Sequence, residues 1–329
     1  MKYCSGLLKS LYWELDIDLV SDLNKIMYDY LIKSGYKNVD LERALYQYFN
    51  LKKRTIKRQS RNIHKSKEFS CPKGYEKALA EFELRIENGD NLNLFLSDKL
   101  KEANYNDGLL NDWNIYHFHL TKQFRDDGWA KRSEFLLFAY ITEADVYMLQ
   151  IYKHKEKYLF SKSELVEIIY NNWPELIEKN HIKDIKPSIS ISDKEYSELR
   201  KANISTLVNL KNEKAFGFIG GGYMSDGSST EAVSAADYWH NLLKNIEGII
   251  IENMELLSNL IIKETGNKTS SFRLQLLWVE NDTEFTLYEH NNKVIVQVNL
   301  EKSQFRICDP LFVFGRERSY YNIKNMILK

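Results

Sequence analysis

The feature that most constrains the fold is an unbroken apolar run, FLLFAYI, at residues 135–141. A strand with one face in water alternates apolar and polar residues, whereas a strand covered on both faces reads as a continuous apolar run. The short polar turn Thr142-Glu143-Ala144 follows, and then the strand-like segment DVYMLQIYKH. This order predicts a β-hairpin that includes a central strand of a sheet.

Helical and strand-like patterns then divide the chain into three expected regions. Residues 1–106 are mostly helical in pattern, and residues 107–205 combine strand-like runs with helices. In residues 206–329 a long helix, starting at a Ser228 and Glu231 capping box, precedes strand-like runs separated by Asn-rich turns. We expect an α+β fold with a helical N-terminal region, a small central antiparallel or mixed sheet flanked by helices, and a C-terminal antiparallel meander.

Composition limits the partners of the chain. Lys plus Arg and Asp plus Glu both total 46, so nucleic acid or membrane would have to be met by a local patch. The three cysteines are far apart, which argues against disulfides and zinc knuckles. No apolar run approaches the ~20 residues of a membrane span, and no signal peptide is evident. We expect a cytoplasmic protein without membrane contact; the oligomeric state is unknown.

The segment DWNIYHFHL places two histidines two residues apart. Side chains at i and i+2 of a strand share a face, so His117 and His119 are expected to be neighbours. His154 ends the third strand-like run, and Arg125 and Arg132 lie in the loop between the first two. Pairing of the strands would bring the histidines and one or two arginines to one edge of the sheet, although the register cannot be read from the sequence.

Three interpretations of these residues remain open. In the first, the histidines are structural and hydrogen-bond their neighbours. In the second, one histidine acts as general base and another as general acid while an arginine stabilises charge, so that RNA is cleaved without metal or other cofactor. In the third, His117, His119 and His154 bind a metal with Asp112 as a fourth ligand, as in a metal hydrolase.

The order WNIYHFHL, a basic loop, R-x-E-F-L-L-F-A-Y-I, a turn and DVYMLQIYKH resembles the sheet of RelE- and HigB-type bacterial messenger-RNA interferase toxins. The resemblance covers about residues 112–156. It implies an endoribonuclease, acting as a toxin or phage-defence effector, with Arg132 and His154 at the functional positions and His117 and His119 as additional candidates. LLNDWNIYHFHL is also similar to a segment of an uncharacterised bacterial protein family of about this length.

Residues 52–67, KKRTIKRQSRNIHKSK, contain eight basic residues and no acid. In a helix, five of them would lie along one stripe that could follow a phosphate backbone. These are the candidate nucleic-acid contacts Arg54, Lys57, Arg58, Arg61 and Lys65. A run of this kind is most often a solvated face or linker, and nucleic-acid contact is the alternative interpretation.

The loop GGGYMSDGSS lacks the lysine of a P-loop, so we expect a flexible connection into the long helix. The function expected from the sequence is therefore a metal-independent endoribonuclease with a histidine and arginine site and RNA as partner. The alternative is a non-enzymatic interaction or regulatory protein in which the sheet is a scaffold and the N-terminal helices bind a protein.

Overall fold

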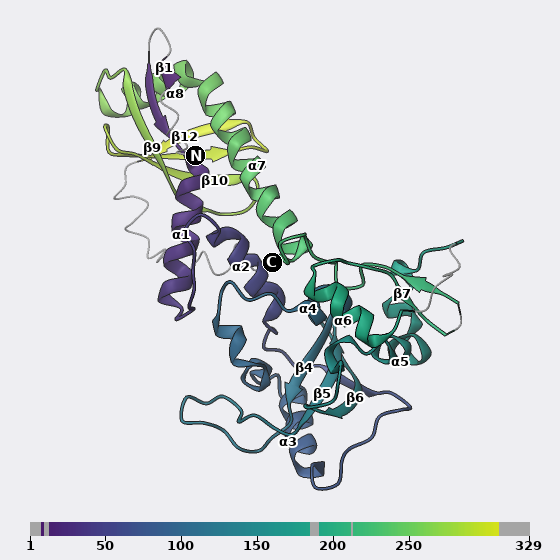
Figure 1. Cartoon of the computed structure of the whole chain (residues 1–329). Helices are drawn as coiled ribbons and strands as arrows, with labels where there is room; N and C mark the ends of the chain where they lie inside the picture. The colour runs from purple at the N-terminus through teal and green to yellow at the C-terminus, as the bar shows by residue number, and fades with distance from the viewer. Residues whose placement is uncertain (1–7, 10–12, 185–190, 212, 309–329) are drawn as a thin grey trace. The chain divides into compact units, whose positions relative to one another are not determined.

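The structure, a computed structural model, describes residues 8–9, 13–184, 191–211 and 213–308 (Figure 1). Groups of helices and groups of strands follow one another along the chain, and the long helix α7 (Thr230–Glu252) precedes a run of antiparallel strands. The α+β class predicted from the sequence is confirmed. No helix among the described residues is long and apolar enough to cross a lipid bilayer.

The chain divides into two compact units. The central unit comprises residues 34–39 and 46–235, and the terminal unit comprises the described residues of 1–33, 40–45 and 236–329. The three regions expected from the sequence have different boundaries. The ends of the chain belong to one unit because a strand near the N-terminus pairs with a strand in the last third, and such a long-range pairing has no local sequence signature.

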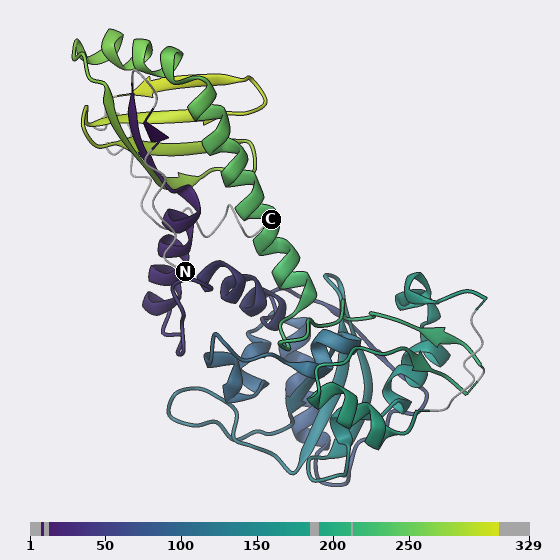
Figure 2. The ribbon, with the colours of Figure 1, turned by 45° about the horizontal axis from the view of Figure 1, so that its top comes forward.

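The terminal unit is built on a six-stranded sheet in the order β1-β2-β9-β10-β11-β12. The last four strands form the expected antiparallel meander, visible as green to yellow strands in Figure 2, and β2 pairs with β9 in parallel. Helix α1 packs against β9, and α8 packs against β12. The bounds are β1 (Leu8–Lys9), β2 (Glu14–Ile17), α1 (Leu19–Lys33), α8 (Met254–Thr265), β9 (Ser271–Val279), β10 (Glu284–Glu289), β11 (Val294–Asn299) and β12 (Gln304–Cys308).

The central unit contains a four-stranded sheet in the order β3-β6-β5-β4. Its strands are β3 (Asn62–Lys65), β4 (Ile115–His119), β5 (Phe135–Ile141) and β6 (Asp145–Lys153). The predicted hairpin of β5 and β6 is present, whereas β3 joins β6 in parallel and makes the sheet mixed. Alternate residues of β5 enter two different hydrophobic cores: Leu136 and Phe138 enter one, Leu137 and Ala139 the other. This two-sided burial explains why the run FLLFAYI has no polar alternation.

Helices cover both faces of this sheet. The helices of the central unit are α2 (Ala44–Arg54, whose first two residues belong to the terminal unit), α3 (Glu76–Glu87), α4 (Gly108–Trp113), α5 (Glu164–Asn172) and α6 (Asp193–Lys201). Short 3-10 helices are η1 (Leu92–Phe95), η2 (Asp98–Lys101), η3 (Leu159–Ser161), η4 (Pro174–Leu176) and η5 (Glu178–Asn180), and a small ribbon pairs β7 (Val208–Asn209) with β8 (Ala215–Phe216). Pro174 begins η4 directly after α5, as expected of a residue that cannot continue a helix.

The start of the long helix differs by one residue from its prediction. The hydroxyl of Ser229 accepts a hydrogen bond from the backbone N–H of Ala232 at 3.4 Å, which places Ser229 at the N-cap of α7. Ser228 instead donates its hydroxyl to the Asp226 carboxylate at 2.9 Å. Glu231 lies 3.1 Å from the ammonium group of Lys53. The predicted capping box is therefore wrong in detail, because two adjacent serines compete for the cap.

The basic run at residues 52–67 is not a helix. Helix α2 ends at Arg54, and residues 62–65 form strand β3. Arg54 is buried and donates to the carbonyl oxygens of Lys99 and Glu102. The condition for a helical stripe of Arg54, Lys57, Arg58, Arg61 and Lys65 is therefore not met. Local periodicity could not show that carbonyls distant in sequence bind some of these cations.

Two more of these basic side chains bind groups within the protein. Arg61 is buried and donates to the carbonyl oxygens of Thr142 and Lys57. Lys65 forms an ion pair of 2.8 Å with Glu83. Contact of Lys57 and Arg58, whose side chains are exposed, with nucleic acid stays a prediction.

Candidate functional site

The central unit contains a cleft of about 580 Å³. Its lining includes all four residues that the sequence analysis chose as catalytic candidates: His117, His119, Arg132 and His154. These four residues are called the His/Arg cluster below. They come from β4, from the loop between β4 and β5, and from the position directly after β6. The structure therefore brings the predicted site residues together from three separate segments.

Strand register explains this convergence. His119 pairs with Leu136 across the β4–β5 ladder, and Leu136 pairs with Tyr152 across the β5–β6 ladder. Residues aligned in this way share a face of the sheet, and His154 lies two residues beyond Tyr152. The ring centroids of His119 and His154 are accordingly 5.8 Å apart. The expected strand beginning at Trp113 is shorter than predicted, since Trp113 ends helix α4 and β4 begins at Ile115.

His117 is partly buried beside aromatic rings. Its ring centroid lies 5.0 Å from that of Phe160 and 6.2 Å from that of Phe138. Burial lowers the pKa of His117, against the opposing attraction of the Asp107 carboxylate and with a smaller lowering by His154. A lowered pKa leaves the imidazole neutral at pH 7, the form in which a histidine accepts a proton.

His119 is more deeply placed, with 6% of its surface exposed. The backbone N–H of Ser133 donates to its Nδ1 at 3.4 Å, which assigns the proton of the neutral ring to Nε2. Burial, with smaller electrostatic contributions from His117, His154 and Arg132, lowers the pKa of His119 to about 4. At neutral pH this side chain is therefore a neutral hydrogen-bond donor through Nε2.

Arg132 and His154 have exposed side chains. The backbone N–H of His154 donates to the Glu134 carbonyl at 2.7 Å, which extends the β5–β6 ladder to the cleft. Arg125, the other arginine of the same loop, is held by the Asp98 carboxylate through two hydrogen bonds of 2.7 and 2.6 Å. Arg125 therefore fixes the loop, and Arg132 is the arginine of this loop that lines the cleft.

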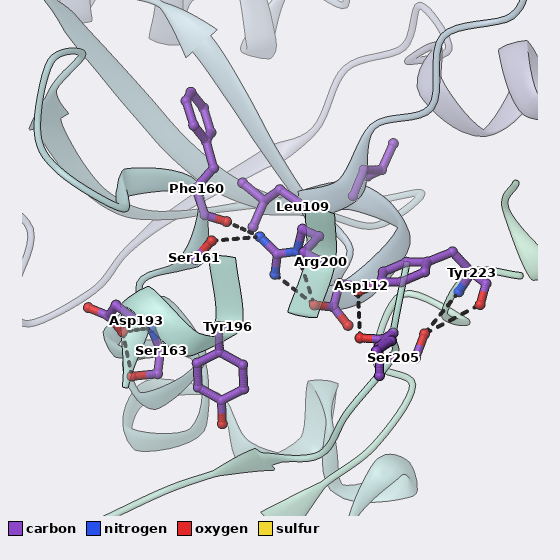
Figure 3. A network of polar contacts seen from close by, with 12 residues as sticks. Leu109, Asp112, Phe160, Ser161, Ser163, Asp193, Tyr196, Arg200, Ser205 and Tyr223 are labelled. Atoms are coloured by element: carbon purple, nitrogen blue, oxygen red, sulfur yellow. Dashed lines mark hydrogen bonds and ion pairs between the residues drawn. The ribbon is translucent and has the colours of Figure 1, made fainter. Parts of the chain in front are cut away.

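A buried ion pair, which the sequence analysis missed, lies beside the cleft (Figure 3). The Arg200 guanidinium lies 2.7 Å from the Asp112 carboxylate, and their side chains are 11% and 8% exposed. The same guanidinium donates to the Phe160 carbonyl and contacts the Ser161 hydroxyl at 3.5 Å. Asp112, expected as a fourth metal ligand, is thus the partner of Arg200. The sequence did contain a signal for this pair: Asp112 lies within an apolar segment, and a buried carboxylate requires a cation as partner.

The Gly-rich loop is docked against helix α4. The backbone N–H groups of Gly220 and Gly222 donate to the carbonyls of Asp112 and Asn111, each at 2.8 Å. A Cβ atom at Gly220 would overlap the Leu110 carbonyl oxygen, so glycine is required for this close approach. The expected flexible loop is therefore a packed connection, and its N–H groups are partly used within the protein.

No group of three or more His, Cys, Asp or Glu side chains in the described part of the chain is arranged to hold a metal ion. Comparison with known proteins gives no match: no family model, curated protein or solved structure is significantly similar to this chain. The resemblance to interferase toxins stays a prediction.

Proposed function

We propose that this protein is an endoribonuclease that cleaves RNA by metal-independent transesterification in the cleft of the central unit. The observation that carries the proposal is the convergence of three histidines and one arginine from three segments on a single cleft. Two of these histidines have lowered pKa values, and perturbed titratable groups in a cleft are typical of catalytic sites. A volume of about 580 Å³ lies within the range of ligand-binding pockets.

The reaction requires two proton transfers. The ribose 2′-hydroxyl attacks the adjacent phosphorus, an O2′–P bond forms and the P–O5′ bond breaks. The products are a 2′,3′-cyclic phosphate and a 5′-hydroxyl end. A general base takes the proton of the 2′-hydroxyl, and a general acid gives a proton to the leaving O5′. No oxidant or further reactant is needed.

The surroundings of each side chain support a division of roles. His117 is the candidate base, because burial keeps it neutral and no hydrogen bond to another described residue occupies its ring nitrogens. Arg132 and the Nε2–H of His119 are candidate donors to the phosphate oxygens, whose negative charge grows during attack. His154, exposed beside His119, is the candidate acid.

Cleavage of a 5′-labelled RNA by the purified protein tests the proposal. His117→Ala and His154→Ala should each lower the rate by about 10²–10⁴-fold, the range for loss of a general acid or base. His119→Ala should lower it by about 10²–10³-fold, the range for loss of one donor to developing negative charge. His290→Ala is the matched control, since His290 follows β10 in the terminal unit and bonds the Gln275 side chain there. The variants should keep the melting temperature of the wild-type protein.

Three results would count against the proposal. Cleavage abolished by EDTA would favour the metal hydrolase, and cleavage unchanged in all three histidine variants would place the activity elsewhere. Loss of several degrees of melting temperature in His119→Ala would assign the cluster a structural role. Product ends identified by mass spectrometry should be 2′,3′-cyclic phosphates. A toxin or defence role predicts, in addition, that expression of the wild-type protein but not His119→Ala arrests bacterial growth.

A further inference from the structure

We infer that Phe160 is the base-stacking residue of the cleft and that the substrate is single-stranded RNA, one base of which lies on the Phe160 ring beside the scissile phosphate. This inference rests on the proposed function and specifies its substrate. It is carried by three observations: the exposure of the ring, the way its backbone is held, and its position against His117.

The Phe160 side chain is unusual for its surroundings. Its ring lines the cleft and the residue is 37% exposed, whereas the two flanking residues, Leu159 and Ser161, are buried. The ring lies edge-on to His117 with a centroid distance of 5.0 Å and is 6.4 Å from His154. A large apolar ring that is left in water between two catalytic candidates has an available face for a planar ligand.

The backbone of Phe160 is fixed by the buried ion pair. Its carbonyl accepts a hydrogen bond from the Arg200 guanidinium, which the Asp112 carboxylate holds in turn. In Figure 3 the carbonyl oxygen faces Arg200 while the ring extends away from it. Tyr158, two residues earlier, has a positive φ of 55°, which turns the chain into η3. The ring is thus presented from a rigid segment, as a recognition platform requires.

The two tyrosines of the cleft differ from Phe160 in the partners of their side chains. Tyr105 lies beneath the guanidinium of Arg54 at 5.5 Å, and Tyr223 donates its hydroxyl to the Ile204 carbonyl at 3.0 Å. Both side chains therefore have polar or cationic partners within the protein, whereas the Phe160 ring contacts the rings of His117, Phe138 and His154 and is still 37% exposed.

The occupant follows from the chemistry around the ring. Exposed aromatic rings beside basic groups are the means by which proteins hold single-stranded nucleic acid, because every base has a π-face. Here the basic groups of the cleft include Arg132 and Lys201. A base stacked on Phe160 would bring its ribose beside His117, the candidate base. Bases within a duplex are already stacked on each other, so the inference excludes double-stranded RNA as substrate.

Binding of a fully 2′-O-methylated oligoribonucleotide, which cannot be cleaved, tests this inference. The probe carries 2-aminopurine, whose fluorescence falls when the base stacks, and its position is moved along the strand. The wild-type protein and Phe160→Trp should quench one position strongly. Phe160→Leu, which keeps apolar volume without a π-face, and Phe160→Ala should lose the quenching and bind about 5- to 150-fold more weakly.

Phe218→Ala is the matched control. Phe218 is an exposed phenylalanine of the same unit, its carbonyl is likewise held by a side chain, that of Asn180, and it is not among the residues of the cleft. Removal of the base at the quenched position should weaken binding to the wild-type protein and leave binding to Phe160→Ala unchanged. Duplex RNA should not compete.

The outcomes separate this inference from the proposed function. Equal affinity and equal quenching in the wild-type protein and Phe160→Ala would overturn the stacking inference while leaving the nuclease intact. Quenching that depends on Phe160 in a protein that cleaves no RNA would support stacking and refute the nuclease. Absence of any binding by the folded wild-type protein would overturn both.

Discussion

Replacement of Arg200 by methionine is the most direct test of the buried ion pair. Methionine keeps much of the apolar volume of the arginine stem but removes both hydrogen bonds to Asp112, of 3.2 and 2.7 Å, and the bonds to η3. Breaking a buried ion pair by removing one partner costs about 3–5 kcal/mol, because the remaining charge is left without compensation. For a unit of this size the loss corresponds to a fall in melting temperature of about 6–20 °C.

The pH dependence of the variant follows from the carboxylate. Burial already raises the folded-state pKa of Asp112 against the opposing effect of Arg200, and removal of Arg200 should raise it further above the unfolded value. The destabilisation should be complete above that raised pKa, and should shrink as the pH falls toward the unfolded value and the carboxyl group takes up a proton. The double variant Asp112→Asn, Arg200→Met should therefore be more stable at pH 8 than Arg200→Met alone.

Urea denaturation at pH 8 and pH 5 measures these free energies of unfolding. Lys201→Met is the control, since Lys201 is the adjacent, exposed cation of α6 and its loss should change stability by less than about 0.5 kcal/mol. A loss below about 1 kcal/mol in Arg200→Met, or additive effects in the double variant, would refute the reasoning that Arg200 compensates a buried charge.

Three other changes have defined outcomes. Burial raises the pKa of Asp22 to about 6, so the charged carboxylate destabilises the fold above pH 6 and has no such effect below about pH 4. In urea denaturation, Asp22→Asn should therefore raise the free energy of unfolding by about 1–2 kcal/mol at pH 8 and change it little at pH 4. The pKa of His119, about 4, should rise in NMR titrations when inorganic phosphate is present, because an anion offsets the surrounding positive charges; an unchanged value would place phosphate elsewhere. Gly220→Ala should destabilise by about 1–3 kcal/mol through overlap with the Leu110 carbonyl, whereas Gly248→Ala, with open space around it in α7, should stabilise by about 1 kcal/mol, as melting temperatures would show.

Local pattern was sufficient for the parts of the fold that depend on neighbouring residues. The hairpin of β5 and β6 follows from an apolar run, a polar turn and a second strand. The C-terminal meander is similarly local, since short turns join strands that pair with their neighbours in sequence. The parallel pairings of β2 with β9 and of β3 with β6 join segments about 80 to 250 residues apart, and no spacing in the sequence indicates them.

The candidate site likewise contains residues that local sequence predicts and residues that only tertiary packing brings in. His117 and His119 share a strand, so their common face could be read from the sequence, and a hairpin placed His154 near them. Arg200 and Phe160 enter only through packing of α6 and η3 against α4. The role of Arg54 in the basic run could not be predicted either, because the carbonyls that bind its guanidinium lie in segments distant in sequence.

Arg200 joins the stability of the central unit to its proposed activity. Its guanidinium holds a carboxylate of α4 on one side and the backbone of η3 on the other, so the arginine that pairs with Asp112 also holds the backbone that carries the Phe160 ring. A lysine at this position would still provide a positive charge for Asp112 but would lack the planar fork that reaches both groups. Stability and base stacking should therefore respond differently to two substitutions. Arg200→Met removes the positive charge and should weaken both. Arg200→Lys keeps the charge but removes the planar guanidinium, and should weaken mainly the stacking of a base on Phe160.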